Sequence, residues 1–306
     1  MNSIASKQNQ QKQLERLAAQ REIYSFAKRL HILQICLTVI IPIILFIVSS
    51  IWSLVLIYSA LFGVLIFIID SILIQPIIKS QKIKAAKIQE LFDCDVLELE
   101  TSPLKVVNDI AVEEILLNYN AHNKIKSNIE KIRDWYPTNI EHMPISIARI
   151  ICQRANCWWD SKLRIRYSNF LKYFGIVVFL SLFIYAFISK IDLIEFTLYL
   201  SALIPFFQFC NKQFVSHRAS ALKLNEMVRF SQEIWEYALN NPEDYHRIKL
   251  NSRRLQDEIY EHRGNSPLIL DRFYNLFRDE NEVLMNRTSE ILIDEANQRI
   301  KSANKV

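Results

Sequence analysis

Apolar and polar positions along this chain are separated into long blocks. Residues 32–69 contain no Lys, Arg, Asp or Glu, and residues 173–210 contain only Lys190, Asp192 and Glu195, close to the centre of the block. A helix needs about 20 predominantly apolar residues to cross the hydrocarbon core of a bilayer. Each block is long enough for two such helices joined by a tight turn. The pattern therefore predicts four transmembrane helices arranged as two hairpins.

The polar residues within each block indicate where the hairpin turns. Ser49 and Ser50 divide the first block into spans at residues 32–48 and 52–73, and the charged group near Lys190 divides the second into spans at 173–188 and 194–210. The predicted organisation, in chain order, is a cytosolic N-terminal helix (1–31), transmembrane hairpin 1 (32–78), a cytosolic middle segment (79–172), transmembrane hairpin 2 (173–211) and a cytosolic helical C-terminal segment (212–306).

Basic residues gather at the ends of the hairpins and avoid their turns. Short loops rich in Lys and Arg remain on the cytoplasmic side of a membrane. The residues at the hairpin ends are Arg16, Arg21, Lys28, Arg29, Lys79, Lys82, Lys84, Lys87, Arg164, Arg166, Lys172, Lys212, His217, Arg218 and Lys223. The two turns carry only Lys190. Both termini and the middle segment are therefore expected in the cytoplasm, where the two polar segments can pack as one body.

Outside the spans, the spacing of apolar residues favours helices, and the chain has only 3 glycines. Residues 94–99 are the best candidate for a strand, because Val96, Leu97 and Leu99 are bounded by Asp93 and by a Thr-Ser-Pro turn. Helices are predicted at residues 104–135, 145–172, 215–239, 243–262 and 268–301. The predicted fold class is mainly α: four transmembrane helices in two hairpins plus a mostly helical cytosolic body with at most a small β element.

The composition and motifs argue against an enzyme. The five cysteines lack C-x-x-C spacing and clustered histidines, so no metal site is expected. No P-loop, G-x-G-x-x-G, H-E-x-x-H or G-x-S-x-G sequence is present, and we expect no catalytic residue and no cofactor. A cleavable signal peptide is not expected either, because about thirty polar residues precede the first apolar block.

The strongest candidate for a binding site is the stretch 149–167. On a helix, Arg149, Gln153, Asn156, Asp160, Arg164 and Tyr167 fall within about 60° of arc, opposite a mostly apolar stripe. Guanidiniums bind phosphates, amides and carboxylates read base edges, and aromatic rings stack, so this set suits a nucleotide. The alternative is an ordinary solvated face with an Asp160–Arg164 ion pair. The predicted ligand-binding residues are Arg149, Gln153, Arg154, Asn156, Trp158, Asp160, Arg164, Arg166 and Tyr167.

Two weaker candidates lie elsewhere. Asp93 and Asp95 are two residues apart and could bind Mg²⁺ or act as an acid–base pair, although Asp93 as a cap at the start of a strand is the alternative. Tyr274 and Arg278 are four residues apart on one helical face with Glu282, and a surface ion pair is the alternative there.

Three segments together resemble one protein family. They are Gln-Glu-Leu-Phe-Asp at 89–93, Cys-Gln-Arg-x-Asn-Cys-x-Trp-Asp-x-x-Leu-Arg-x-Arg-Tyr at 152–167, and Pro267 with Phe273, Tyr274, Arg278 and Glu282. With the two apolar hairpins, they resemble the SMODS-associating four-transmembrane effectors of bacterial anti-phage signalling (CBASS). The resemblance extends over nearly the whole chain.

The resemblance implies a mechanism for the chain. A synthase activated by infection makes a cyclic di- or oligonucleotide, which binds the cytosolic body. The subunits assemble as a homo-oligomer, and the spans permeabilise the bacterial inner membrane, causing abortive infection. The implied partners are this messenger and the lipid bilayer, with a functional link to the synthase and no DNA or RNA. Three alternatives stay open: a constitutive small channel or transporter subunit, a membrane anchor or adaptor, and a membrane-tethered enzyme using Asp93, Asp95 or Asp160.

Overall fold

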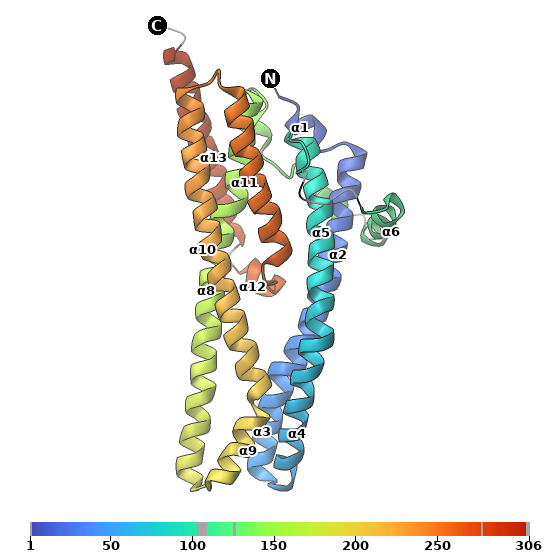
Figure 1. Cartoon of the computed structure of the whole chain (residues 1–306), viewed down its shortest axis with the longest axis vertical. Coiled ribbons are helices and arrows are strands. Elements are labelled where there is room, and N and C mark those ends of the chain that lie inside the picture. Colours follow the sequence, from blue (N-terminus) through green and yellow to red (C-terminus); the bar gives the residue numbers. More distant parts are fainter. Residues whose placement is uncertain (1, 103, 105–108, 125–126, 277, 304–306) are drawn as a thin grey trace.

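The computed structural model describes residues 2–102, 104, 109–124, 127–276 and 278–303, and within these ranges it contains helices and turns but no strand. The molecule is elongated (Figure 1), with two long hairpins whose turns lie together at one end. The beginning and the end of the described chain lie at the opposite end. This arrangement places both termini on the same side of any membrane that the hairpins cross.

Two long helical rods form hairpin 1. They consist, in chain order, of α2 (Gln11–Ile35), η1 (Cys36–Ile40), α3 (Ile41–Ile51), α4 (Leu54–Ile69), η2 (Asp70–Ile74) and α5 (Gln75–Val96). Both η1 and η2 are π-helical turns, and a proline follows closely after each of them, Pro42 after η1 and Pro76 after η2. Proline lacks the N–H that would continue the helix, and its ring clashes with the carbonyl four residues earlier. The wider π turns accommodate this loss and mark two irregular points near the membrane boundary.

Hairpin 2 consists of α8 (Ile145–Ser189), α9 (Leu193–Ala202) and α10 (Ile204–Asn240). Lys190 has a left-handed conformation with φ 51° and ends α8, and the Asp192 side chain caps α9 by accepting from the N–H of Glu195. A bend of 53° separates α9 from α10. With 45 residues, α8 is about 68 Å long, more than twice the thickness of the hydrocarbon core. It therefore runs from the membrane far into the polar body.

The prediction of four spans in two hairpins is confirmed. Three helical rods, Gln11–Ile51, Leu54–Val96 and Ile145–Ser189, are long and apolar enough to cross a membrane, and the bent pair of α9 and α10 makes a fourth. Large apolar side chains of the spans are exposed, for example Leu61 at 67% and Phe187 at 84%. Their exposure is expected of a surface that faces lipid. Which side of the membrane holds the termini stays a prediction.

The remaining helices form the polar body. They are α1 (Ile4–Lys7), α6 (Val112–Asn123), α7 (Ser127–Glu130), η3 (Thr138–Ile140), α11 (Tyr245–Asn265), α12 (Asp271–Asn275) and α13 (Arg278–Ala303). Where the two hairpins diverge from the membrane end, α11 lies between them and packs against α5 and α10 (Figure 1). The largest apolar core surrounds this helix and includes the fully buried Trp235, Phe92 and Tyr136. The body thus holds the two hairpins apart at one end while they contact each other at the other.

The expectations for the secondary structure of residues 94–99 and 104–135 are wrong. The segment 94–99 is not a strand: α5 continues through Val96 and ends in a turn in which Leu97 and Leu99 donate to the carbonyls of Asp93 and Cys94. Its apolar side chains are buried at the end of a helix. A short apolar run in a sequence is compatible with a buried helix end as well as with a buried strand, so the pattern alone does not separate the two. The helix predicted at 104–135 is broken into the short α6 and α7, and part of that range lies outside the described residues. The helices predicted at 145–172, 215–239 and 243–262 are confirmed within α8, α10 and α11.

The helix predicted at 268–301 is also interrupted. It begins as the five-residue α12 and resumes as α13. Pro267 precedes this region, and residues 266–270 form an extended connector between α11 and α12. This connector lies beside the two hairpins and, as described below, forms part of a cavity wall.

Candidate functional site

The face of α8 that was predicted to bind a ligand is largely buried inside the body. Arg149, Gln153, Arg164 and Tyr167 are only 4%, 0%, 8% and 3% exposed. The expectation that one face packs while the other is presented to a ligand is therefore wrong, because Ile151 on the opposite stripe is buried too. The reason is that the polar helix α11 and the end of α5 lie against this part of α8 and supply partners for its polar side chains.

Arg149 closes the end of α5. Its Nε donates to the carbonyl of Leu97 over 2.7 Å, and its Nη2 donates to the carbonyl of Glu98 over 3.3 Å. The last carbonyls of a helix lack intrahelical partners and attract positive charge. Burial lowers the pKa of Arg149 to about 10. This arginine is therefore engaged in joining α8 to α5.

Gln153 connects α8 to a buried polar network. Its Nε2 donates to the carbonyl of Ser252 over 2.9 Å and to Oε1 of Gln256 over 3.0 Å. Gln256 in turn donates through its Nε2 to Glu90 and to Asp93, each over 2.8 Å. The structure thereby joins two candidates that lie far apart in the sequence, Gln153 and Asp93, through one glutamine of α11.

Two ion pairs lie at the centre of this network. Asp93, which is fully buried, pairs with Arg263 and also accepts from the hydroxyl of Tyr136 over 2.7 Å. Glu90 pairs with Arg253 over 2.5 Å, and burial raises the pKa of Glu90. Removing one partner of a buried ion pair leaves an uncompensated charge and is strongly destabilising. The network therefore clamps α11 against α5.

Asp95 points to a different part of the body. It accepts from Arg16 over 2.5 Å and from Gln13 over 3.2 Å, both on α2. Hydrogen bonding from Arg16 is the largest of the effects that lower the pKa of Asp95, and together these effects outweigh the opposing effect of burial. Asp93 and Asp95 therefore serve separate contacts. Among the described residues, no three His, Cys, Asp or Glu side chains are grouped so as to hold a metal ion.

The other predicted residues of α8 are distributed over its surface. Arg154 donates to Gln232 of α10, Trp158 is 40% exposed, and Arg166 is exposed. Asp160 accepts from Arg164 over 2.9 Å, so the ion pair of the alternative interpretation is present, although Arg164 is buried rather than solvated. The side chains of Asn156, Tyr274 and Arg278 lie outside the part of the structure that is described.

Arg164 links this stretch to the connector after α11. Its Nη1 donates to the carbonyl of Pro267 over 3.0 Å and lies 3.4 Å from Nδ1 of His217. Burial lowers the pKa of His217 far below its usual range, and the charge of Arg164 lowers it further. The histidine is therefore neutral beside the guanidinium. Through this contact, α8 holds one wall of a half-open cavity in the described part of the molecule.

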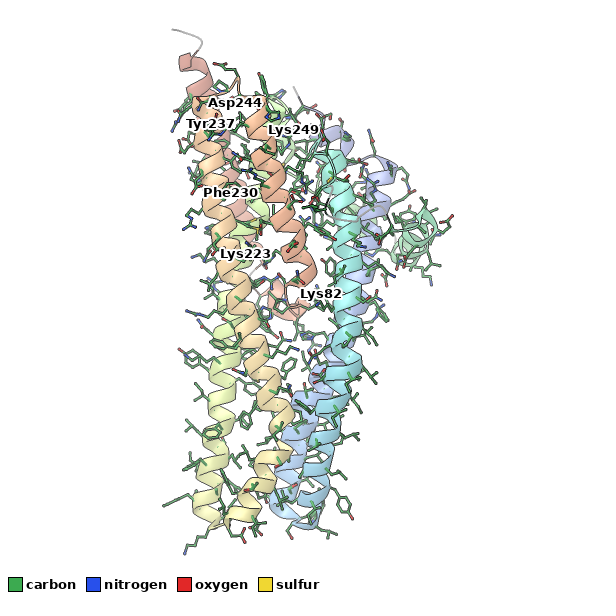
Figure 2. All side chains as sticks on the ribbon, viewed as in Figure 1. Lys82, Lys223, Phe230, Tyr237, Asp244 and Lys249 are labelled. Atoms are coloured by element: carbon green, nitrogen blue, oxygen red, sulfur yellow. The ribbon has the colours of Figure 1, made fainter. Side chains whose placement is uncertain are left out.

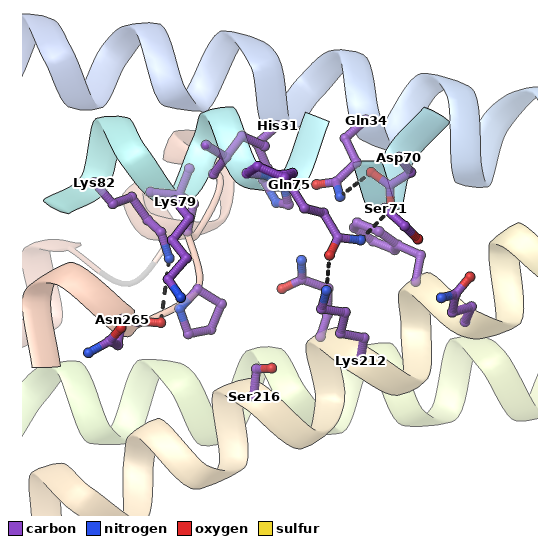
Figure 3. A pocket seen from close by; sticks show the side chains of 17 residues that line it. His31, Gln34, Asp70, Ser71, Gln75, Lys79, Lys82, Lys212, Ser216 and Asn265 are labelled. Carbon is purple, nitrogen blue, oxygen red and sulfur yellow. Dashed lines mark hydrogen bonds between the residues drawn. The ribbon is translucent and has the colours of Figure 1, made fainter. Parts of the chain in front are cut away.

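The cavity has a volume of about 460 Å³ and lies where the two hairpins leave their apolar segments (Figure 3). Its walls come from α2, η2 and α5 of hairpin 1, from α10 of hairpin 2, and from the connector that includes Pro267. Small-molecule sites are commonly concave spaces of this size, placed between helices. An occupant would contact both hairpins and the body simultaneously.

Positive charge dominates the cavity wall. Lys79, Lys82 and Lys212 line it, together with the carboxylate of Asp70. Asp70 accepts from Gln34 over 2.6 Å and from Gln75 over 2.5 Å, so both of its oxygens are engaged. The excess of ammonium groups over carboxylates among these lining residues favours an anion.

Lys82 is the most buried of these lysines, at 7% exposed. Its Nζ donates to the carbonyls of Ser266 over 2.7 Å and Asn265 over 3.4 Å. Burial lowers the pKa of Lys82 to about 8, and the positive charges of Arg164, Lys79 and Lys212 lower it further. A negatively charged ligand would relieve this repulsion.

Three lysines of the cavity are prominent in the sequence, where they indicate membrane orientation and not a binding site. Lys79, Lys82 and Lys212 stand directly after spans two and four, and they were counted only as indicators of orientation. Their convergence depends on how the two hairpins meet, which a single sequence does not show. The three lysines are therefore recognisable as basic residues in the sequence, but their grouping into one cavity requires the arrangement of the two hairpins.

Fold and site together define a class: a multi-pass helical membrane protein whose spans continue into a polar body, with a cationic cavity at the junction. The chain matches the SMODS-associating 4TM effector domain over residues 2–292. It therefore belongs to this family, as the resemblance of its motifs implied.

A curated relative supports the same assignment. Over 175 residues, the chain is 28% identical to a protein of Bacillus cereus (strain VD146) that is described as a probable CBASS effector molecule. The match covers 55% of this chain and 57% of the relative, so the chain spans little more than half the length of that protein. No solved structure matches the chain.

Proposed function

We propose that this protein is a membrane effector of anti-phage defence that binds a cyclic di- or oligonucleotide through its cytosolic body and then permeabilises the inner membrane. Family membership and the Bacillus cereus relative support the role of a CBASS effector. The structural observation that carries the proposal is the continuity of α5, α8 and α10, which run from apolar spans into the polar body. A ligand that repositions the body would also reposition the spans.

The body has the connections that such coupling requires. The clamp between Asp93 and Arg263 fixes α11 to α5, and Arg164 fixes α8 to the connector beyond α11. A ligand shifts a conformational equilibrium only by its difference in affinity for the two states. Binding energy released where these elements meet can therefore favour a second arrangement of the hairpins. In this proposal the α8 stretch acts chiefly as a mechanical link, with Arg154, Trp158 and Arg166 on its surface.

Permeabilisation requires more than one subunit. The spans contain few polar side chains, and Ser181 and Ser201 donate to carbonyls of their own helices. Four spans with this surface cannot enclose a water-filled path, so a pore or a membrane defect would form between assembled copies. We therefore include a homo-oligomer in the proposal, with the exposed apolar faces of the hairpins available for contact with further copies.

The test is ligand-dependent leakage from liposomes that contain the purified full-length protein. A panel of cyclic di- and trinucleotides is added to vesicles loaded with a fluorescent dye, and at least one member should release the dye. Leakage of the same extent without any nucleotide would favour a constitutive channel and refute the effector. Consumption of the nucleotide, abolished by Asp95→Asn, would favour the membrane-tethered enzyme instead. Leakage that is unchanged in Arg154→Ala and Arg164→Ala would remove both residues from sensing.

A further inference from the structure

The lysines of the junction cavity have no carboxylate partner among the described residues. In the described ranges, no carboxylate lies within ion-pair distance of Lys79, Lys82 or Lys212. Lys82 is held by neutral carbonyls, and Lys212 donates to Oε1 of Gln75. By contrast, Lys84 and Lys87, on the same helix as Lys82, pair with Glu114 and Asp109. The cavity therefore retains uncompensated positive charge.

A second observation is that buried polar atoms of the cavity wall have no partner. His31 is only 2% exposed, and among the described residues its Nε2 has no hydrogen-bond partner. Gln34 donates its amide N–H to Asp70, so Oε1 of Gln34 faces Nδ1 of His31 over 2.8 Å and accepts its proton. In the neutral ring, Nε2 is consequently an acceptor. Gln213 also lines the cavity, and its Oε1 is likewise without a partner in the described part of the chain.

These groups match the polar parts of a nucleotide. Ammonium groups suit the oxygens of a phosphodiester, and the free acceptors at His31 and Gln213 suit a ribose hydroxyl or an exocyclic amine. Buried polar groups without partners are rare and call for an explanation, and a role in ligand binding is one. The same cations could also receive the phosphate of a lipid headgroup, because the cavity lies close to the membrane boundary.

We propose that this cavity binds a phosphate ester, with Lys79, Lys82 and Lys212 as its anion contacts and with His31 and Gln213 as acceptors. The inference rests on the proposed function, in which the occupant is the cyclic nucleotide messenger. It assigns the messenger to the junction of the hairpins rather than to the surface of α8.

The position of the site explains how binding would act on the membrane. Lys212 and Gln75 form a bond between the two hairpins across the cavity, and Lys82 donates to the carbonyl of Asn265 (Figure 3). Lys82 also holds the connector by donating to the carbonyl of Ser266. An anion competes for both ammonium groups. A bond from the ligand to Lys212 thus replaces the bond between the two hairpins, and a bond from the ligand to Lys82 replaces the bond that holds the connector. Binding here favours an arrangement in which the hairpins separate at the membrane boundary.

The direct test uses inorganic pyrophosphate as the probe for full-length protein in nanodiscs of phosphatidylcholine. Isothermal titration should give saturable binding, weakened about tenfold or more in Lys79→Gln and Lys212→Gln, whose side chains are exposed. Lys82→Met should weaken it at least as much. Lys249→Gln is the matched control, since this lysine lies far from Lys82 at the distal end of α11 (Figure 2). Equal affinity in all four variants, or no saturable binding by the unsubstituted protein, would overturn the proposal.

Further arms separate the two sources of phosphate and the two proposals. If the occupant is a lipid, nanodiscs with about 30% phosphatidylglycerol should abolish pyrophosphate binding; if it is a messenger, a cyclic nucleotide should compete while the anionic lipid has no effect. Nucleotide-dependent leakage that persists in Lys79→Gln and Lys212→Gln would refute the site and leave the effector function standing. Intact pyrophosphate binding without leakage for any nucleotide would refute the effector function and leave the anion site.

Discussion

The two hairpins approach each other closely at Gly63 of α4, and this contact gives a sharp test of the packing. A Cβ added at Gly63 would lie 2.8 Å from the carbonyl oxygen of Ser201 and 3.2 Å from that of Ala202, both on α9. Glycine at such positions lets helix backbones approach each other closely within a membrane. Gly175 of α8 is a matched control, because its added Cβ would meet only Cys210, at an ordinary contact distance of 3.7 Å.

The expected magnitude follows from two opposing effects. Replacing glycine by alanine inside a helix favours folding by about 1 kcal/mol, and this effect applies at both sites. Overpacking a close contact costs about 1–3 kcal/mol, and the clash with backbone oxygens at Gly63 cannot be relieved by rotating a side chain. Gly175→Ala should therefore raise the free energy of unfolding by about 1 kcal/mol. Gly63→Ala should leave it lower than Gly175→Ala does by about 1–3 kcal/mol.

The assay is reversible unfolding of the full-length protein in mixed micelles, in which the proportion of SDS is raised and helicity is followed by circular dichroism. The two variants share the same chemical change, so their difference isolates the steric contact. Gly63→Leu should extend the trend beyond that of Gly63→Ala. Equal stability of Gly63→Ala and Gly175→Ala would show that α4 and α9 do not approach each other as described.

Three further predictions concern the body, the cavity and the orientation. Asp93→Asn should lower the free energy of unfolding by about 3–5 kcal/mol in chemical denaturation, because it leaves a buried guanidinium without its partner, whereas Glu100→Gln in an exposed pair should leave it unchanged. Pyrophosphate affinity should fall as the pH rises above about 8, because the pKa of Lys82 is about 8 in the free protein and a bound anion raises that pKa. Titrations from about pH 7 to 9.5 that give constant affinity would exclude Lys82 as a contact. A membrane-impermeant maleimide should label Leu193→Cys in intact spheroplasts but Trp158→Cys only after lysis, and labelling of the latter in intact cells would invalidate the cytosolic site.

The membrane-spanning part of the fold was predictable from sequence because lipid imposes a simple rule. Every backbone polar group inside a bilayer must be satisfied within its own helix, so a block such as residues 32–69 has essentially one structural solution. The turn was predicted at Ser49 and Ser50, whereas α3 continues through Ile51 and the chain turns at Trp52 and Ser53. The π turns before Pro42 and Pro76 were not predicted from the two prolines. A kink, a helix break and a π turn can each accommodate the missing N–H and the ring of a proline, so the residue alone does not determine which of them forms.

The burial of the predicted binding face on α8 was missed for a different reason, and ligand binding by these residues stays a prediction. The arc from Arg149 to Tyr167 was correctly recognised as polar, but polarity does not reveal whether water, a ligand or another helix satisfies it. Here α11 does so in large part, with Ser252 and Gln256 accepting from the amide of Gln153. Helix α11 is itself strongly polar, and its buried Ser252 and Gln256 give no sequence signal that distinguishes them from solvent-facing residues. Which polar helices pair is a tertiary property, and the pattern of residues in a single sequence does not reveal it.

The same logic strengthens the argument for the junction cavity. A polar body satisfies its buried groups where it can, as the contacts of Arg149, Gln256 and Asp93 illustrate. The body also contains unpartnered buried atoms, such as Oε1 of Gln153. The unpartnered Nε2 of His31 differs from them because it lies on a cavity wall, beside ammonium groups without carboxylate partners. An unsatisfied buried donor or acceptor costs about 1–3 kcal/mol of stability. In a passive membrane anchor this cost would have no benefit, whereas in a protein that binds a ligand at this cavity the ligand would satisfy these atoms. If His31→Phe raised the stability of the protein measured without nucleotide while abolishing its response to nucleotide, that cost would be shown to serve binding; a stabilised variant that still responded would assign the histidine to packing alone.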